Sequence, residues 1–238
     1  QIQCPISEEI DESVYSQDIL APVATALSKP PLAGSVDFIV LTKGVPLRIH
    51  SDAPATNPQF SPNGDSVDSR LMCQDIAGLS SPSRNPFFNS EKRFTHKATS
   101  LYLVTRLDGY TVKDAEALVD RSLAAKPAKG TYLLDSCPSR AKTADPPSLG
   151  LPSLTESLSI AAKSLKSRGF TVMFDQSDKF VGDIPNLMGY WSWGSNDPSF
   201  NIKLYKGNTF RPGAIAETAV STSARTMLPT SGGQSLIA

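Results

Sequence analysis

The segment from Leu187 to Asp197, LMGYWSWGSND, decides the fold of this chain. It is a short apolar and aromatic run that breaks at Gly194 into a polar cluster, SND. A second apolar run, Gly213 to Val220, breaks in the same way into the polar residues STS at 221–223. Buried strands that end in polar turns are typical of a parallel sheet, and open α/β folds hold ligands at the carboxyl edge of such a sheet.

Four further apolar runs predict strands that are covered on both faces: Val36 to Thr42, Leu101 to Thr105, Thr131 to Leu134 and Phe170 to Phe174. Two amphipathic segments predict helices near 112–125 and 155–168, with Thr111 and Thr155 as N-caps, and a shorter helix is predicted near Val67 to Ile76. The alternation of strands and helices predicts an α/β fold with a mostly parallel, doubly wound sheet and helices on both faces.

A chain of 238 residues can bury the core of one α/β domain, and we expect a single domain over residues 1–238. The chain starts at Gln1 without Met and ends in QSLIA, so we expect the domain to be incomplete at both ends. A long segment from Asp52 to His96 is rich in Ser, Pro, Asn and Asp and interrupts the alternation. It is predicted to be an excursion that holds the short helix.

The formal net charge of the chain is zero, because it contains 23 Lys and Arg residues and 23 Asp and Glu residues. This balance offers no basic field for phosphates, so nucleic acid is not an expected partner. No apolar run reaches the roughly 18 residues of a membrane-spanning helix, so no direct span is expected. Cys4, Cys73 and Cys137 show no metal-ligand spacing, and neither a metal nor a cofactor is expected; the sequence leaves open whether two of them form a disulfide.

Polar residues follow the predicted strands, and parallel topology predicts that they meet in a crevice at one edge of the sheet. These candidates for a ligand or partner site are Lys43, Arg106, Asp108, Asp135, Asp175, Ser195, Asn196, Asp197, Ser221 and Ser223. The alternative is that they are turn and cap residues, and that Arg106 and Asp108 form an ion pair that locks a loop.

The sequence contains only weak patterns of catalytic or ligand-binding residues. A dyad of Cys137 with His50 is conceivable, although a single Cys is more often a small buried hydrophobic residue. Asp65 and Asp68 suggest a calcium loop, but Asp65 or Ser66 as the N-cap of a helix explains them equally well. The aromatic residues of YWSW at 190–193 could stack on a ligand, and they more often pack a core.

Five motifs of the chain carry a resemblance to a known family. They are VDFIVLTKGVPLRI (36–49), SVDSRL (66–71), YLVTRLDGYTVKDAEALVD (102–120), YWSWGSND (190–197) and RPGAIAETAVSTSART (211–226). Through these motifs the chain resembles an uncharacterised family of exported bacterial proteins. That family is similar to the gingipain and caspase class of cysteine proteases, in which one strand ends in a His-Gly turn and the next strand in a catalytic Cys. The resemblance implies a caspase-like or gingipain-like fold and an exported, periplasmic or extracellular location.

The residues at the two catalytic positions differ from those of the proteases. This chain has Trp193, Gly194 and Ser195 at the first position, and Ser221 and Ser223 with no Cys at the second. Because a caspase-type mechanism needs a thiolate beside an imidazole, we expect no such activity.

Two functions remain after this comparison. The first is a non-catalytic, protease-like module that binds other proteins or acts as a scaffold in an extracytoplasmic complex of the envelope or membrane. The second is a hydrolase, peptidase-like, that uses a serine or Cys137 in an unconventional site at the carboxyl edge of the sheet, with Lys43 as the evident substitute base.

Overall fold

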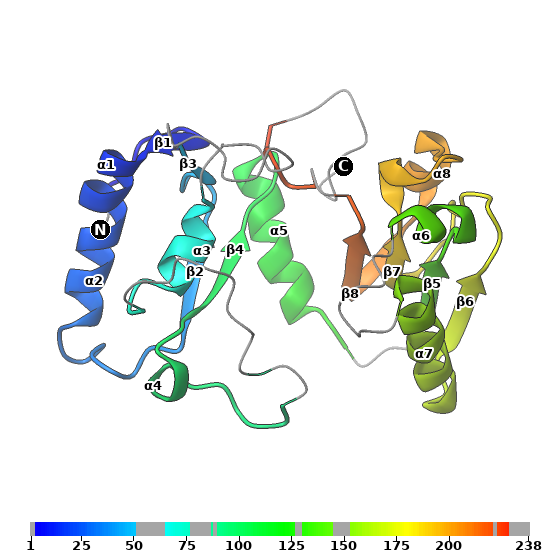
Figure 1. Cartoon of the computed structure of the whole chain (residues 1–238), viewed down its shortest axis with the longest axis horizontal. Helices are drawn as coiled ribbons and strands as arrows, with labels where there is room; N and C mark the ends of the chain where they lie inside the picture. The colour runs from blue at the N-terminus through cyan, green and yellow to red at the C-terminus, as the bar shows by residue number, and fades with distance from the viewer. Residues whose placement is uncertain are drawn as a thin grey trace. The chain divides into compact units, whose positions relative to one another are not determined.

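The computed structural model describes residues 3–50, 65–76, 87, 90–126, 130–144, 153–220 and 223–228 (Figure 1). The chain divides into two compact units, Gln1–Ala115 and Glu116–Ala238. Both combine helices with parallel strands, so the chain belongs to the α/β class that the alternating pattern predicted.

The first unit contains two parallel pairs of strands. β1 (Glu9–Asp11) pairs with β3 (Arg48–His50), and β2 (Phe38–Thr42) pairs with β4 (Leu103–Leu107). A continuous helical stretch follows β1 and consists of α1 (Glu12–Val14), the π-helical turn Tyr15–Leu20 and α2 (Ala21–Leu27). Two short helices complete the unit, α3 (Val67–Met72) and α4 (His96–Thr99).

One hydrophobic core joins these elements. Tyr15 and Ile19 of the helical stretch pack with Ile49 of β3 and with Leu71 of α3, and the same cluster contains Leu41 of β2. The two strand pairs therefore share a core although they are not hydrogen-bonded to each other.

The second unit is built on a four-stranded parallel sheet in the order β6-β5-β7-β8. The strands are β5 (Thr131–Asp135), β6 (Thr171–Asp175), β7 (Leu187–Ser192) and β8 (Phe210–Thr218). β5 pairs with β6 on one side and with β7 on the other, so the order of the strands reverses at β5. A topological switch point, where open α/β sheets form their ligand crevice, therefore lies between the carboxyl ends of β5 and β7.

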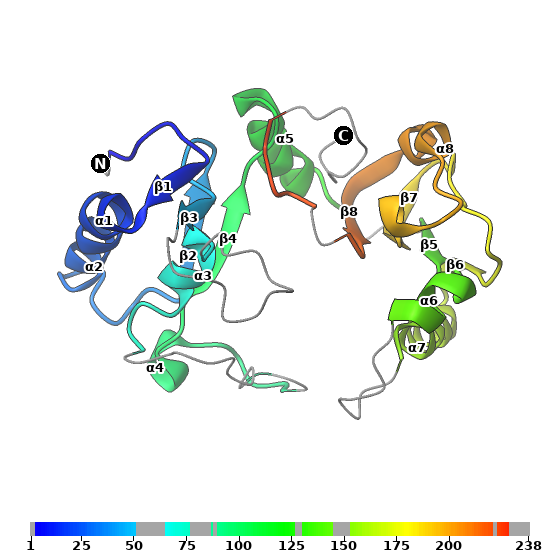
Figure 2. The ribbon, with the colours of Figure 1, turned by 45° about the horizontal axis from the view of Figure 1, so that its top comes forward.

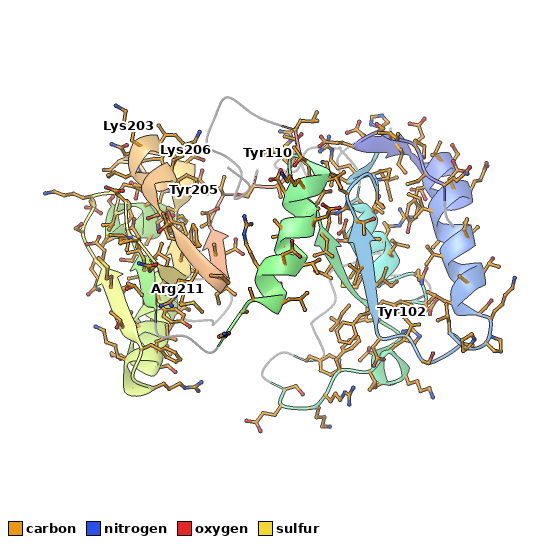
Figure 3. The ribbon with its side chains drawn as sticks, turned by 180° about the vertical axis from the view of Figure 1, so that it is seen from behind. Tyr102, Tyr110, Lys203, Tyr205, Lys206 and Arg211 are labelled. Carbon is orange, nitrogen blue, oxygen red and sulfur yellow. The ribbon has the colours of Figure 1, made fainter. Side chains whose placement is uncertain are left out.

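Alternate residues of β5 pack against opposite covers of this sheet. Leu134 packs on α7 (Leu154–Ser167) through Leu158, whereas Leu133 contacts a cluster on the other face that includes Tyr205 of α8 (Ile202–Gly207). Figure 2 shows α7 and α8 on opposite sides of the sheet, and Figure 3 labels Tyr205 over it. The period of two along the strand thus produces a sheet that is covered on both faces.

Two further helices belong to the connections. α6 (Pro138–Ala144) follows β5, and α5 (Val112–Leu123) contains the boundary between the units. Thr111 and Asp114 form the expected capping box at α5, because the Thr111 amide N–H donates to Asp114 Oδ2 at 2.8 Å and the Asp114 amide N–H donates to Thr111 Oγ1 at 3.2 Å. The expected cap of α7, Thr155, is wrong. Ser153 caps that helix, and its hydroxyl accepts from the Glu156 amide at 3.1 Å.

The predicted strands and the helices near 67–76, 112–125 and 155–168 are confirmed, with ends shifted by one to four residues. The described strands form two pairs and one four-stranded sheet. A single domain with one continuous, doubly wound sheet stays a prediction. Most of the excursion from Asp52 to His96 lies outside the described residues.

Leu133 provides a test of the core of the second unit. Its side chain is fully buried at the centre of the sheet, so Leu133→Ala should lower the free energy of unfolding by about 2–5 kcal/mol, as measured by urea denaturation. Ile6→Ala is the matched control, because Ile6 is 98% exposed and its truncation should leave the stability within about 0.5 kcal/mol of the wild type. Equal effects of the two variants would contradict this placement of the core.

Candidate functional site

The candidate residues of the first unit, Lys43, Arg106 and Asp108, do meet at the carboxyl ends of β2 and β4. Lys43 Nζ donates to the Gly109 carbonyl at 2.6 Å and lies 3.3 Å from Asp108 Oδ1. Arg106 Nη1 is 3.5 Å from Asp108 Oδ2. The Asp108 carboxylate is therefore held between two cations, and its side chain is only 5% exposed.

The guanidinium of Arg106 is fully used by this part of the fold. It donates to the carbonyls of Val45 at 2.7 Å and Pro46 at 3.0 Å. It also donates two hydrogen bonds to the Asp68 carboxylate, at 2.7 and 3.3 Å, in a bidentate arrangement. These bonds tie the turn after β2 and the first turn of α3 to β4. The alternative of a loop-locking ion pair is thus the better account of Arg106 and Asp108.

The N-cap explanation of the segment at 65–68 is also confirmed. Ser66 caps α3 by accepting a hydrogen bond from the Ser69 amide at 3.0 Å. Asp65 lies 3.3 Å from Arg70, and Asp68 binds Arg106, so both carboxylates are paired with arginines. Among the described residues, no group of three or more His, Cys, Asp or Glu side chains could hold a metal ion.

In the second unit, a buried polar cluster lies at the switch point between β5 and β7. Asp135 is fully buried at the end of β5, and its Oδ2 accepts from the Val181 amide at 3.1 Å. Asp197 is 3% exposed, and its Oδ1 accepts from the Ser199 amide at 2.6 Å. The other oxygen of each carboxylate, Asp135 Oδ1 and Asp197 Oδ2, has no hydrogen-bond partner within the described residues.

Burial has a large electrostatic effect on Asp135. It raises the pKa of Asp135 from 3.8 to about 7, because a buried carboxylate loses its hydration, and the negative charges of Asp197 and Asp175 add to the rise. The Val181 amide opposes the shift by stabilising the ionised form. Asp135 therefore gains or loses a proton near neutral pH.

Two hydroxyl groups of β7 complete the polar cluster. The Tyr190 and Ser192 hydroxyls lie 2.8 Å apart, and Ser192 Oγ accepts from the Gly194 amide at 3.0 Å. Burial raises the pKa of Tyr190, so its hydroxyl stays protonated. The sequence predicted Tyr190 only as an aromatic residue that stacks on a ligand or packs a core, and Ser192 was not predicted at the site because it lies inside the strand. Their spacing of two places both on the same face of β7.

Trp193 and Cys137 close the carboxyl ends of the same two strands. The indole N–H of Trp193 donates to the Ser136 carbonyl at 2.8 Å, and the ring packs in one cluster with Cys137 and Ala141. Burial raises the pKa of the Cys137 thiol, so at neutral pH it is a thiol rather than a thiolate. The aromatic residues therefore pack a core here, as the alternative for YWSW proposed.

The turn after Trp193 is shaped by close packing. Gly194 has φ +51°, and a Cβ at this position would come within 2.8 Å of a Val220 methyl group. Asn196 Nδ2 donates to the Ala219 carbonyl at 2.6 Å. The end of β7 is thus bonded directly to the end of β8.

The remaining candidates have local roles or lie outside the described residues. Asp175 Oδ2 accepts from the amide and the hydroxyl of Ser177 at 3.0 and 2.8 Å. Ser195 is half-buried in the turn after Trp193, and Ser223 Oγ lies 3.1 Å from Thr218 Oγ1. Ser221 falls outside the described residues.

His50 and Cys137, the two residues of the conceivable dyad, belong to different units. His50 belongs to the first unit, where Nδ1 lies 3.5 Å from Glu9 Oε1, and the sequence places no histidine in the second unit. Cys4, Cys73 and Cys137 are free thiols rather than disulfide partners. No helix in the described part of the chain is long and apolar enough to cross a membrane.

Comparisons of the chain with protein-family models, with curated proteins and with solved structures find no match.

The protonation of Asp135 predicts how stability depends on pH. Between about pH 4 and pH 7 the folded chain keeps a proton that the unfolded chain releases, so the free energy of unfolding should fall across this range and level off above it. Asp135→Asn should remove this fall and should be more stable than the wild type at pH 8 by roughly 1–3 kcal/mol, measured by urea denaturation at pH 5 and pH 8. Asp120→Asn, at an exposed position of α5, is the control. A variant whose pH dependence parallels that of the wild type would contradict the assignment.

The role of Arg106 predicts that a conservative change is costly. Arg106→Lys keeps the charge but cannot reach Asp68 and the two backbone carbonyls together, so it should destabilise the fold by about 1–3 kcal/mol. Arg121→Lys, at an exposed position of α5, should have little effect. Thermal unfolding of both variants makes the comparison, and an unchanged midpoint for Arg106→Lys would refute the structural role.

Proposed function

We propose that this chain is a non-catalytic, protease-like module that binds other proteins in an extracytoplasmic assembly. The observation that carries the proposal is the position of Trp193. In the protease class that the motifs resemble, the strand equivalent to β7 ends in a His-Gly turn. Here an indole occupies that place, is 5% exposed and is bonded to the Ser136 carbonyl.

The arrangement of β7 and β8 supports the same proposal. They are adjacent parallel strands, and the resemblance assigns the His and Cys positions of the proteases to the segments that follow them. The contact between Asn196 and Ala219 joins these two strand ends. Under this proposal, the imidazole and the thiol of the proteases are replaced by Trp193 and by the serines of the STS run at 221–223.

The state of Cys137 supports the loss of thiol chemistry. It is the one cysteine that the sequence places in the second unit, and its side chain is fully buried. Attack by sulfur requires an exposed thiolate, whereas burial favours the neutral thiol here. A module without a nucleophile can still bind partners through loops on a rigid sheet.

The proposal includes a caspase-like or gingipain-like fold and an exported location. A parallel sheet with a reversal of strand order and helices on both faces is what a caspase-like or gingipain-like, doubly wound fold requires. The exported location and the partners in an envelope or membrane-associated complex come from the resemblance of the five motifs. The neutral net charge of the chain supports protein rather than nucleic acid as the partner.

A hydrolase is the second candidate function, and Asp135 is the observation that favours it. A carboxyl group with a pKa of about 7 can act as a general acid or base at neutral pH. Its burial next to Cys137, however, leaves no described path to a substrate, so the binding module is the stronger proposal.

Thiol reactivity tests the absence of catalysis. In the folded chain at pH 7.5, a peptidyl inhibitor directed at cysteine proteases should leave Cys137 unmodified, and iodoacetamide should modify Cys4 and Cys73, which are partly exposed, much faster than Cys137. Denaturation in urea should make all three thiols equally reactive. Mass spectrometry of tryptic peptides measures each site, with Cys137→Ser as the control for assignment.

Rapid labelling of Cys137 by the inhibitor, or cleavage of a peptide library that is lost in Cys137→Ser, would overturn the non-catalytic proposal.

Binding is tested separately by chemical cross-linking of the full protein in its native envelope fraction. The expected result is a defined complex with one or a few proteins, and a chain that stays uncross-linked would contradict the module.

A further inference from the structure

A cavity in the first unit is independent of the site at the switch point. It has a volume of about 250 Å³ and lies where the end of α2 and the following loop meet α4 and the start of β4. Its lining residues are Ala24, Leu27, Ser28, Ala33, Gly34, Asp75, His96 and Tyr102. This volume is below the roughly 300–1,000 Å³ of sites for drug-sized ligands, so it suits a small group.

The polar end of the cavity is an ordered group of three side chains. Tyr102 donates its hydroxyl hydrogen to Asp75 Oδ2 at 3.0 Å, and His96 Nε2 lies 3.4 Å from the same oxygen. The rings of His96 and Tyr102 are stacked, with centroids 4.0 Å apart and an angle of 15° between their planes. Figure 3 labels Tyr102 at this end of the first unit.

Several contacts hold these groups in place before any ligand binds. His96 Nδ1 is 3.1 Å from the Leu101 carbonyl, and the His96 amide donates to Asp37 Oδ1 at 2.8 Å. Burial raises the pKa of Tyr102 to about 12, so its hydroxyl remains a donor to Asp75. A site that is already ordered loses less entropy when it binds.

The chemistry of the cavity favours a cation with a short apolar body. Both contacts of Asp75 described above fall on Oδ2, and 42% of this side chain is exposed, so Oδ1 can accept from a ligand. The rings of His96 and Tyr102 and the side chains of Ala24 and Leu27 of α2 line the same cavity. A carboxylate beside aromatic rings and apolar walls matches an alkylammonium ion.

We propose that this cavity binds an ammonium group on a short alkyl chain, with Asp75 as its counter-ion. A free small amine and the side chain of a lysine on a partner protein both present this group. The inference goes beyond the proposed binding module and does not depend on it, because none of its residues belongs to the second unit.

NMR titration of the full chain with n-butylammonium chloride tests the proposal, with 1-butanol as the uncharged probe of the same size. We expect saturable shifts of residues around the cavity with a dissociation constant in the millimolar range, and clearly weaker binding of 1-butanol. Asp75→Asn should weaken n-butylammonium roughly tenfold or more, because the amide oxygen still accepts from Tyr102 but carries no charge. Asp18→Asn, at an exposed position outside the cavity, should bind as the wild type does.

Two further variants test the shape and the charge of the site. Ala24→Leu fills the cavity from an exposed position of α2, so it should weaken binding without unfolding the chain. Lys97 packs near Gly34, where its Cε lies 3.4 Å from the position of an added Cβ. Lys97→Met removes a positive charge near the cavity, so it should leave the binding of n-butylammonium unchanged or strengthen it. Weaker binding of n-butylammonium to Lys97→Met would contradict recognition of the ligand by its positive charge and overturn the proposal.

Equal binding of n-butylammonium to the wild type and to Asp75→Asn, or no saturable binding to the wild type, would also overturn the proposal. Nα-acetyl-lysine methylamide then separates the two sources of the ammonium group. Binding at least as tight as that of n-butylammonium supports a lysine of a partner protein, and much weaker binding supports a free amine. The results of these two titrations are independent of the Cys137 labelling, which concerns the second unit.

Discussion

The hydrogen bond from the Trp193 indole to the Ser136 carbonyl is the interaction on which the second unit depends. It joins the carboxyl ends of β5 and β7 at the place where the strand order reverses. An open α/β sheet normally leaves a crevice at such a point. Here the indole fills it, Cys137 packs against the ring, and the carboxylates of Asp135 and Asp197 are enclosed. The same constraint that closes the sheet therefore also removes the thiol from solvent and shifts the pKa of Asp135.

The buried carboxylates at the strand ends of the two units differ in how the free-energy cost of burying their charge is offset. In the first unit, Asp108 lies between Lys43 and Arg106, so the attraction offsets the lost hydration. In the second unit, Asp135 and Asp197 are buried near each other, and protonation of Asp135 is what lowers the cost. The first group stabilises loops, whereas the second couples the fold to pH. A difference in neighbouring charge, rather than in residue type, separates the two groups.

The sequence predicted much of the fold and less of the site. Strand and helix positions follow from local periodicity, and the capping box at Thr111 needs only two residues three positions apart. The helical stretch Glu12–Leu27 was missed, and so were the roles of Tyr190 and Ser192. The hydroxyls of the last two meet because a spacing of two places them on one face of β7. Burial and the charges of Asp197 and Asp175 together raise the pKa of Asp135. That burial and those charges come mostly from residues distant in the sequence, so no local pattern carries them.

Hydrogen exchange of the Trp193 indole N–H tests the central claim most directly, namely that this side chain closes the site. In protein with ¹⁵N-labelled tryptophan, the Trp191→Phe variant assigns the remaining indole signal to Trp193. The account predicts that this proton exchanges as slowly as the amides of β5, because it is buried and bonded to the Ser136 carbonyl. Exchange at the rate of an unprotected indole would show that the end of β7 opens to solvent in the native state, and would contradict a closed, non-catalytic site.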